Sequence, residues 1–126
     1  MNISRLSRLA AVGAVTFTAI AASTVPASAH SDKIVYLPNG RGYMKFYDNG
    51  DVFEVCDTKA DGHGVTGQLW AKNQITQNGS TAFTLKDGGD KGCDKKAYDI
   101  GKLHTYSMQV EWDGDRVWHF SEWFNE

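Results

Sequence analysis

The sequence lacks most of the features that point to a membrane, to nucleic acid or to a repeat architecture. It has no low-complexity tract, no internal repeat and, after the first 29 residues, no long hydrophobic segment. Lysine and arginine total 13 against 15 aspartates and glutamates, and without residues 1–29, which contain Arg5 and Arg8, the charge is 11 − 15 = −4. Phosphate backbones and anionic lipids repel an acidic chain, so we expect neither nucleic acid nor a membrane as partner.

The first 29 residues have the pattern of an export signal. Arg5 and Arg8 form a positively charged start, residues 9–22 are apolar, and Ala27-Ser28-Ala29 matches the small-x-small pattern of a cleavage site. The apolar stretch is shorter than the roughly 20 residues of a membrane-spanning helix. We therefore expect a secreted, extracellular protein in which residues 30–126, or 126 − 29 = 97 residues, form a single domain.

Cysteine is also scarce, since Cys56 and Cys93 are the only two. In an exported chain an even number of cysteines usually means a disulfide. A redox pair would normally have only two residues between its cysteines, which is not the spacing here. The sequence therefore predicts a structural Cys56–Cys93 disulfide that compensates for a small core.

Apolar and polar residues alternate with a period of two along most of the chain, and no window of a dozen residues has the stripe of an amphipathic helix. Hairpin turns are expected at Asn49-Gly50, Asn78-Gly79 and near Asp113-Gly114-Asp115. The strand-forming segments are residues 33–37, 43–55, 65–72, 81–86, 97–103 and 106–123, of which 33–37 and 97–103 are the weaker. We predict an all-β fold, a small antiparallel β-sandwich or barrel of six to seven strands.

The stretch VCDTKADGHGVTGQLW, residues 55–70, concentrates acidic residues and glycines. Asp57 and Asp61 could contribute oxygen ligands to a calcium ion. The stretch nevertheless lacks the alternation of an EF-hand loop and its distal glutamate. A tight turn at Asp61-Gly62, in which aspartates accept hydrogen bonds from local backbone N–H groups, explains the same residues. We favour the turn and expect no metal or other cofactor.

A copper site is an alternative function. Cleavage after Ala29 would make His30 the first residue, and its amino group and imidazole could chelate Cu(II) together with His63, His104 or His119. No methionine-rich copper segment accompanies it.

Catalysis is not expected. The chain has no Gly-x-Ser-x-Gly nucleophile elbow. A glycosidase pair could be drawn from Glu54, Glu111 and Glu122, but strands commonly carry such residues on their polar faces. We therefore expect a protein that acts by binding.

Aromatic residues are frequent near the end of the sequence, in VWHFSEWFNE. Exposed tryptophan and tyrosine anchor protein partners or stack on sugar rings, whereas a central last strand would bury the same residues in the core. The expected contact residues, from this segment and from the edge segment 33–43, are Trp118, Phe120, Trp123, Phe124, Tyr36 and Tyr43. An extracellular carbohydrate-binding or inhibitory module is a further alternative.

The stretch FYDNGDVFEVCDTKADGHGVTGQLW, residues 46–70, resembles a motif common in small exported proteins of actinobacteria. In size, export and disulfide content the chain is similar to the small adaptor subunits of umbrella toxin particles. Those adaptors are β-proteins that link a lectin-like subunit to a large toxin polypeptide aimed at competing bacteria. The resemblance implies an adaptor in an extracellular toxin complex, with other secreted proteins of these two kinds as partners.

Overall fold

The structure is a computed structural model that describes residues 31–88 and 92–126. The export-signal prediction for residues 1–29 and the copper prediction for His30 lie outside the described residues. The described residues form one single-turn 3-10 helix, η1 (Pro38–Gly40), and the strands β1 (Lys33–Tyr36), β2 (Gly42–Tyr47), β3 (Val52–Asp57), β4 (Val65–Asn73), β5 (Gly79–Asp87), β6 (Asp94–Ala97), β7 (His104–Trp112) and β8 (Trp118–Phe120). Within these ranges no helix is long and apolar enough to cross a membrane.

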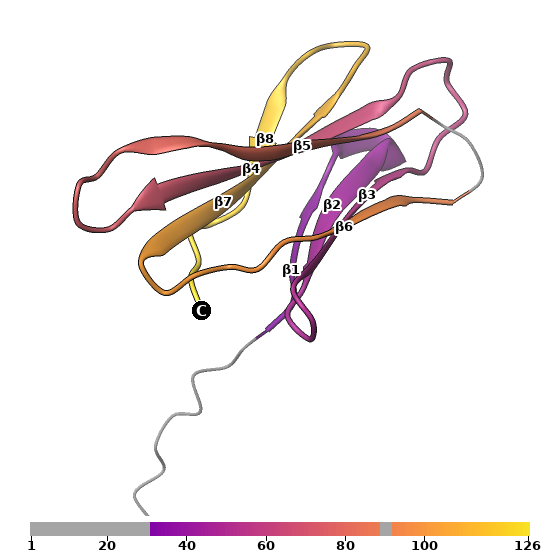
Figure 1. Ribbon diagram of the computed structural model, residues 1–126. Helices are drawn as coiled ribbons and strands as arrows, with labels where there is room; N and C mark the ends of the chain where they lie inside the picture. Colours follow the sequence, from indigo (N-terminus) through magenta and orange to yellow (C-terminus); the bar gives the residue numbers. More distant parts are fainter. Residues whose placement is uncertain (1–30, 89–91) are drawn as a thin grey trace, which may run out of the picture.

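The strands form two four-stranded antiparallel sheets that face each other as in a β-sandwich (Figure 1). Sheet A has the order β1-β2-β3-β6, and sheet B has the order β5-β4-β7-β8. The all-β prediction is confirmed, but the described strands number eight instead of six to seven. The last strand of sheet A also differs in position, since β6 ends at Ala97, where the sequence pattern placed the start of a strand.

Local turn chemistry explains two of the hairpins. Between β2 and β3 a turn forms around Asn49-Gly50 as expected, but the positive φ angles are those of Gly50 and Asp51, one residue later than the Asn-Gly pattern predicted. Between β4 and β5 the turn lies at residues 74–78 instead of at Asn78-Gly79. Asn73 causes the difference, because its side-chain oxygen accepts hydrogen bonds from the backbone N–H groups of Ile75 (2.8 Å) and Thr76 (3.0 Å), which closes the turn before β5 begins.

The core lies between the sheets and is rich in aromatic rings. Phe46 of sheet A stacks against both Phe53 and Phe124, with ring centroids 4.8 Å and 5.3 Å apart. In sheet B the core side of β4 includes Gly67, where a Cβ atom would lie 2.5 Å from Val55 Cγ2 and 2.9 Å from Met44 Sδ. The two sheets therefore approach closely at this glycine, and side chains of sheet A fill the space above it.

The register of β7 and β8 settles which aromatic residues face outward. Val110 lies in the core and pairs with His119, whereas Gln109 on the opposite side of β7 pairs with Phe120. Because paired residues on neighbouring strands share a face, Trp118 and Phe120 project from the outer face of sheet B.

Candidate binding surfaces on the two outer sheet faces

The outer face of sheet A carries a group of exposed and half-buried aromatic and aliphatic side chains, which we call the tyrosine face. It consists of Ile34, Tyr36, Tyr43 and Tyr47, whose neighbours along β1 and β2 point into the core. Tyr36 is 67% exposed and meets Tyr43 edge to face, with ring centroids 6.0 Å apart. Both tyrosines nominated from the sequence therefore lie on one surface.

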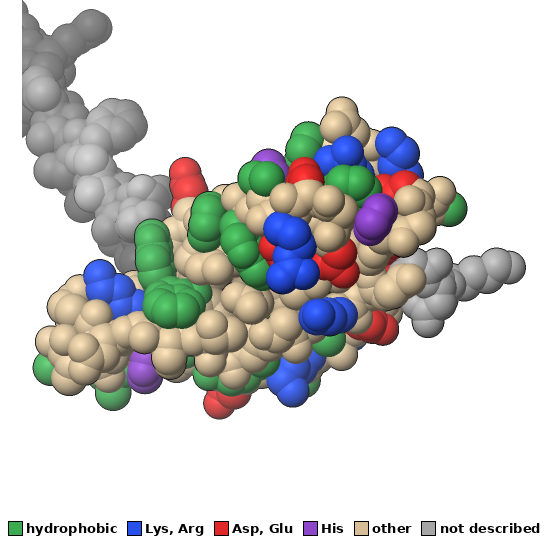
Figure 2. Space-filling view, turned by 90° about the horizontal axis from the view of Figure 1, so that it is seen from above, with side chains coloured by type: hydrophobic (Ala, Val, Ile, Leu, Met, Phe, Trp, Pro, Cys, Tyr) green, Lys and Arg blue, Asp and Glu red, His purple; other side chains and the backbone are tan. Residues whose placement is uncertain are grey.

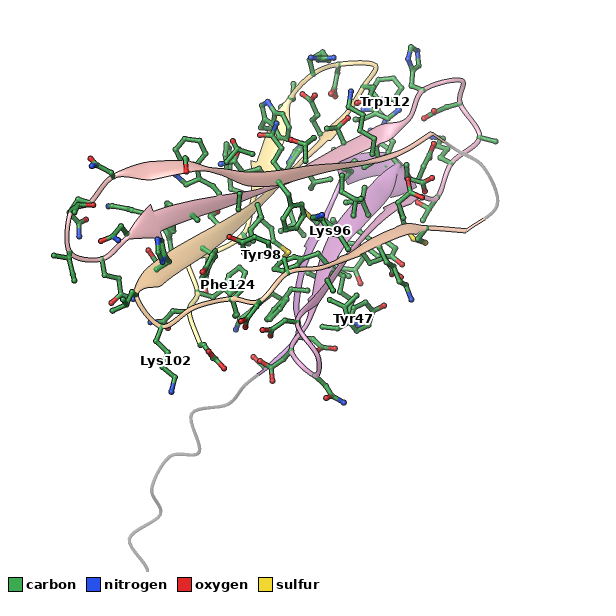
Figure 3. All side chains as sticks on the ribbon, viewed as in Figure 1. Tyr47, Lys96, Tyr98, Lys102, Trp112 and Phe124 are labelled. Atoms are coloured by element: carbon green, nitrogen blue, oxygen red, sulfur yellow. A yellow bond between two sulfur atoms is a disulfide. The ribbon has the colours of Figure 1, made fainter. Side chains whose placement is uncertain are left out.

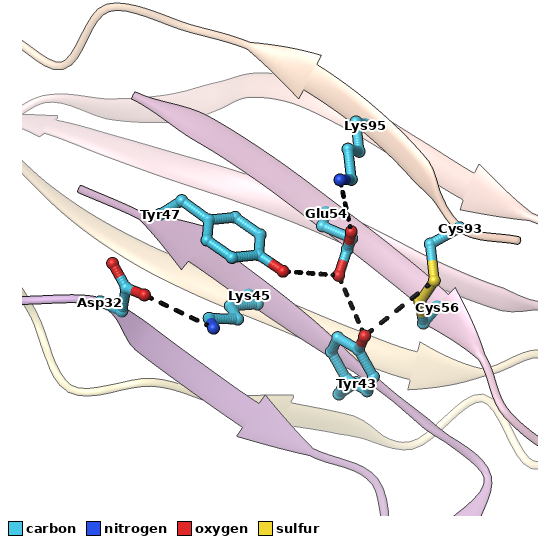
Figure 4. Close-up of polar contacts among 8 residues, drawn as sticks. All are labelled: Asp32, Tyr43, Lys45, Tyr47, Glu54, Cys56, Cys93 and Lys95. Carbon is cyan, nitrogen blue, oxygen red and sulfur yellow. Dashed lines mark hydrogen bonds and ion pairs between the residues drawn. A yellow bond between two sulfur atoms is a disulfide. The ribbon is translucent and has the colours of Figure 1, made fainter. Parts of the chain in front are cut away.

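A buried carboxylate holds part of this face in place. Glu54 of β3 is only 5% exposed, and its Oε1 accepts hydrogen bonds from the hydroxyl groups of Tyr43 (2.9 Å) and Tyr47 (3.0 Å) (Figure 4). Lys95 of β6 places its Nζ 3.2 Å from Oε2 of the same carboxylate. Three strands thus contribute to one hydrogen-bonded group, which restricts the rotation of the two tyrosine rings.

The pKa values in this group follow from burial and hydrogen bonding. Burial by itself raises the pKa of Glu54, but the hydrogen bonds from Tyr43, Lys95 and Tyr47 together outweigh it, so the pKa of Glu54 lies below its usual value. Burial, followed by the hydrogen bond to Glu54, raises the pKa of Tyr43 to about 12. At neutral pH the group therefore contains an ionised carboxylate and a neutral Tyr43 phenol.

This arrangement makes the contribution of Glu54 to stability depend on pH. Because its folded-state pKa is lowered, the contribution is present above the unfolded-state pKa of about 4.3 and is lost as the pH falls through the folded-state value. We expect Glu54→Gln to reduce the free energy of unfolding at pH 7 more than at pH 3, as measured by urea denaturation. Glu122→Gln, at an exposed glutamate away from the tyrosine face, is the matched control. Equal losses at both pH values for Glu54→Gln would contradict the lowered pKa.

The predicted disulfide between Cys56 and Cys93 is present at the end of the tyrosine face. The Tyr43 hydroxyl lies 4.0 Å from Cys93 Sγ, and Glu54 is also close, so Glu54 and the two sulfurs form a cluster of metal-ligating atom types. Because the sulfurs are bonded to each other, they offer no thiolate to a metal ion.

The two aspartates considered for calcium lie in the connection between β3 and β4. Asp57 Oδ1 accepts a hydrogen bond from the backbone N–H of Lys59, and Asp61 Oδ1 accepts one from that of His63, each at 3.1 Å. These are the contacts of aspartates that stabilise turns. These two hydrogen bonds support the turn interpretation. In the described ranges neither residue belongs to a cluster of three metal-ligating side chains.

The outer face of sheet B carries a second aromatic group, the tryptophan face, which consists of Trp70, Trp118, Phe120 and Trp123. Phe120 and Trp123 are 61% and 52% exposed. The Trp70 ring lies over Gly79, where a Cβ atom would be 2.7 Å from the indole nitrogen, so only glycine leaves room for it. Figure 2, seen from above Figure 1 and thus from the side of sheet B, shows hydrophobic groups with charged side chains between them.

The fourth C-terminal residue nominated for partner contact, Phe124, lies in the core. It is 8% exposed (labelled in Figure 3) and bridges to Tyr106 through backbone hydrogen bonds in both directions. Its ring stacks on that of Phe46. It therefore belongs to neither outer face.

Sequence reasoning missed Tyr47, Trp70 and the role of Glu54. Tyr47 lies four residues after Tyr43 and therefore on the same face of β2, so the period of two offered a signal for it. No protein-family model, no curated protein and no solved structure matches the chain.

Proposed function

We propose that the protein is a secreted, non-enzymatic adaptor that binds one protein partner on each outer face, as a component of an extracellular toxin complex used in competition between bacteria. The observation that supports this proposal is the presence of exposed aromatic groups on both outer faces of one sandwich. Tyrosine and tryptophan are enriched among the residues that dominate binding energy in protein interfaces. A small domain with two such surfaces can hold two larger chains together, in this proposal a lectin-like subunit and a large toxin polypeptide.

The tyrosine face has a further property that favours binding. Tyr43 and Tyr47 are already hydrogen-bonded to Glu54, so they lose little conformational freedom when a partner covers them. Two ion pairs, Lys45 with Asp32 and Lys95 with Glu54, compensate the charge of the lysines on this face. The face therefore offers aromatic area without an uncompensated charge to desolvate.

The test is affinity purification from the native secreted fraction with a C-terminal tag, followed by mass spectrometry. We expect the intact protein to retain two partners in a fixed ratio. Ile34→Ser combined with Tyr36→Ala should lower retention of one partner at least about tenfold and leave the other, and Phe120→Ala combined with Trp123→Ala should do the reverse.

The matched control is Ile75→Ala, at an exposed isoleucine in the β4–β5 turn, outside both faces. It should leave retention of both partners unchanged. An intact protein that is recovered alone, or face variants that retain both partners as well as the intact protein does, would contradict the adaptor proposal.

Carbohydrate binding is a second proposal, and the register of sheet B favours it. Thr84, Gln68, Gln109 and Phe120 form one row across the four strands. Amide side chains beside exposed aromatic rings suit sugars, whose hydroxyls hydrogen-bond and whose ring faces stack. Retention of the intact protein on a polysaccharide matrix, with loss of retention in Gln68→Ala, would support this proposal over the adaptor.

A further inference from the structure

A cavity of about 370 Å³ lies between the β4–β5 hairpin and residues 98–106, apart from both aromatic faces. Its volume falls in the range of ligand pockets, roughly 300–1,000 Å³. The side chains that give it chemical character are Asn78, Ser80, Tyr98, Asp99, His104 and Tyr106. The proposed adaptor function makes no use of this cavity.

Aromatic rings form part of the cavity wall. Tyr98 and Tyr106 meet edge to face with ring centroids 6.4 Å apart, and the His104 ring lies 6.1 Å from that of Tyr106. The Tyr106 hydroxyl accepts a hydrogen bond of 2.8 Å from the backbone N–H of Gly101, which fixes the ring. The faces of tyrosine rings carry negative electrostatic potential and attract cations that come within about 6 Å.

Acidic side chains line a hollow that shares residues with this cavity. Asp99 and Tyr98 also line a neighbouring hollow of about 540 Å³, together with Asp51 and Glu126. Burial raises the pKa of Asp51, and the nearby Glu126 and Asp99 carboxylates raise it too, although the hydrogen bond from the Ile100 N–H acts in the opposite direction. The two neighbouring carboxylates therefore disfavour the charged form of Asp51, and a bound cation would relieve that repulsion.

His104 is the one basic side chain of the described ranges that lines the cavity or the neighbouring hollow. No lysine or arginine among those residues lines either hollow. Lys96 places its Nζ 5.8 Å from the Phe83 ring, and Lys102 points away from the sheets (Figure 3).

We propose that the cavity binds a primary ammonium group, such as the end of a lysine side chain, between its tyrosine rings and the Asp99 carboxylate. An ammonium group has three N–H donors, and Asp99, Ser80 and Asn78, whose side chains carry acceptor oxygens, line the cavity. The aromatic rings contribute cation–π attraction to the same group. The combination selects a cation of small size over a neutral or anionic ligand.

The test is a titration of the ¹⁵N-labelled protein by NMR with two capped tripeptides, Gly-Lys-Gly and the same peptide with an Nε-acetylated lysine. We expect saturable shifts confined to the amides of residues 78–82 and 98–106 with the first peptide, and at least tenfold weaker binding of the acetylated peptide. Asp99→Asn should weaken binding of the first peptide at least fivefold. Asp94→Asn, at an exposed aspartate that lines neither hollow, is the matched control and should leave binding unchanged.

A third titration, with n-butylamine, separates the two sources of the ammonium group. Tighter binding of the peptide supports a lysine of a protein partner, whereas equal binding supports recognition of free amines. Equal binding of the acetylated and unmodified peptides would overturn the proposal, as would unlocalised shifts or unchanged affinity in Asp99→Asn. The NMR spectrum of each variant shows directly whether it is folded.

Discussion

Phe46→Ala is expected to lower the free energy of unfolding by about 3–5 kcal/mol, as measured by guanidinium denaturation. Phe46 is 2% exposed and stacks against Phe53 and Phe124, so its removal leaves a cavity that rings on both sides cannot fill. Phe46 is also the residue of sheet A on which Phe124, near the end of the described chain, stacks its ring.

The matched control for this prediction is Phe120→Ala, at a phenylalanine only four residues before Phe124 but 61% exposed on the outer face of sheet B. Its effect on the free energy of unfolding should stay within about 0.5 kcal/mol, as for other surface substitutions. Similar losses in the two variants would show that the outer and inner faces of β8 have been assigned wrongly. The comparison also separates stability from binding, because Phe120→Ala should affect only the latter.

The double variant Cys56→Ala with Cys93→Ala is expected to lower the free energy of unfolding by about 4 kcal/mol in the chain-entropy model. The bond closes a loop between residues 37 positions apart and joins β3 to the residue before β6. Without it the unfolded chain gains conformational freedom, and the folded chain loses the covalent attachment of an edge strand with four exposed residues.

Denaturation with and without a reducing agent provides the control for the cysteine variant. Reduction of the intact protein should lower its stability by about the same amount, whereas the double variant should not respond to the reductant. If the reduced protein were as stable as the oxidised one, backbone pairing alone would hold β6 to β3.

Local sequence signals predicted the parts of the fold that depend on neighbouring residues. A turn at Asn49-Gly50 was predictable because glycine adopts positive φ readily, as Gly50 does. Met108 and Val110 alternate with more polar residues along β7, and both are fully buried in the core. The disulfide was predictable because the chain offers only one pairing of its cysteines.

The features that the sequence did not reveal depend on contacts between distant segments. The sequence of β6, Asp-Lys-Lys-Ala, has no apolar alternation, and all four of its residues are exposed. Its position in the sheet follows from its pairing with β3. Glu54 resembles any polar residue of a half-exposed strand until Lys95 and two tyrosines from β2 surround it. Phe124 lies beyond the end of β8, so the alternation of that strand gave no information about its direction.

The order of the strands has a consequence for how the chain reaches its fold. The β2–β3 and β4–β5 hairpins join residues close in sequence, but Glu54 pairs with Lys95, 95 − 54 = 41 positions away, and Leu69 pairs with Met108, 108 − 69 = 39 positions away. Such non-local pairings give a high contact order, which is typical of domains that fold in milliseconds to seconds. Before β6 pairs with β3, the edge of β3 is open to strands of other chains. The slower this non-local pairing is, the longer misassembly through that edge can compete with folding.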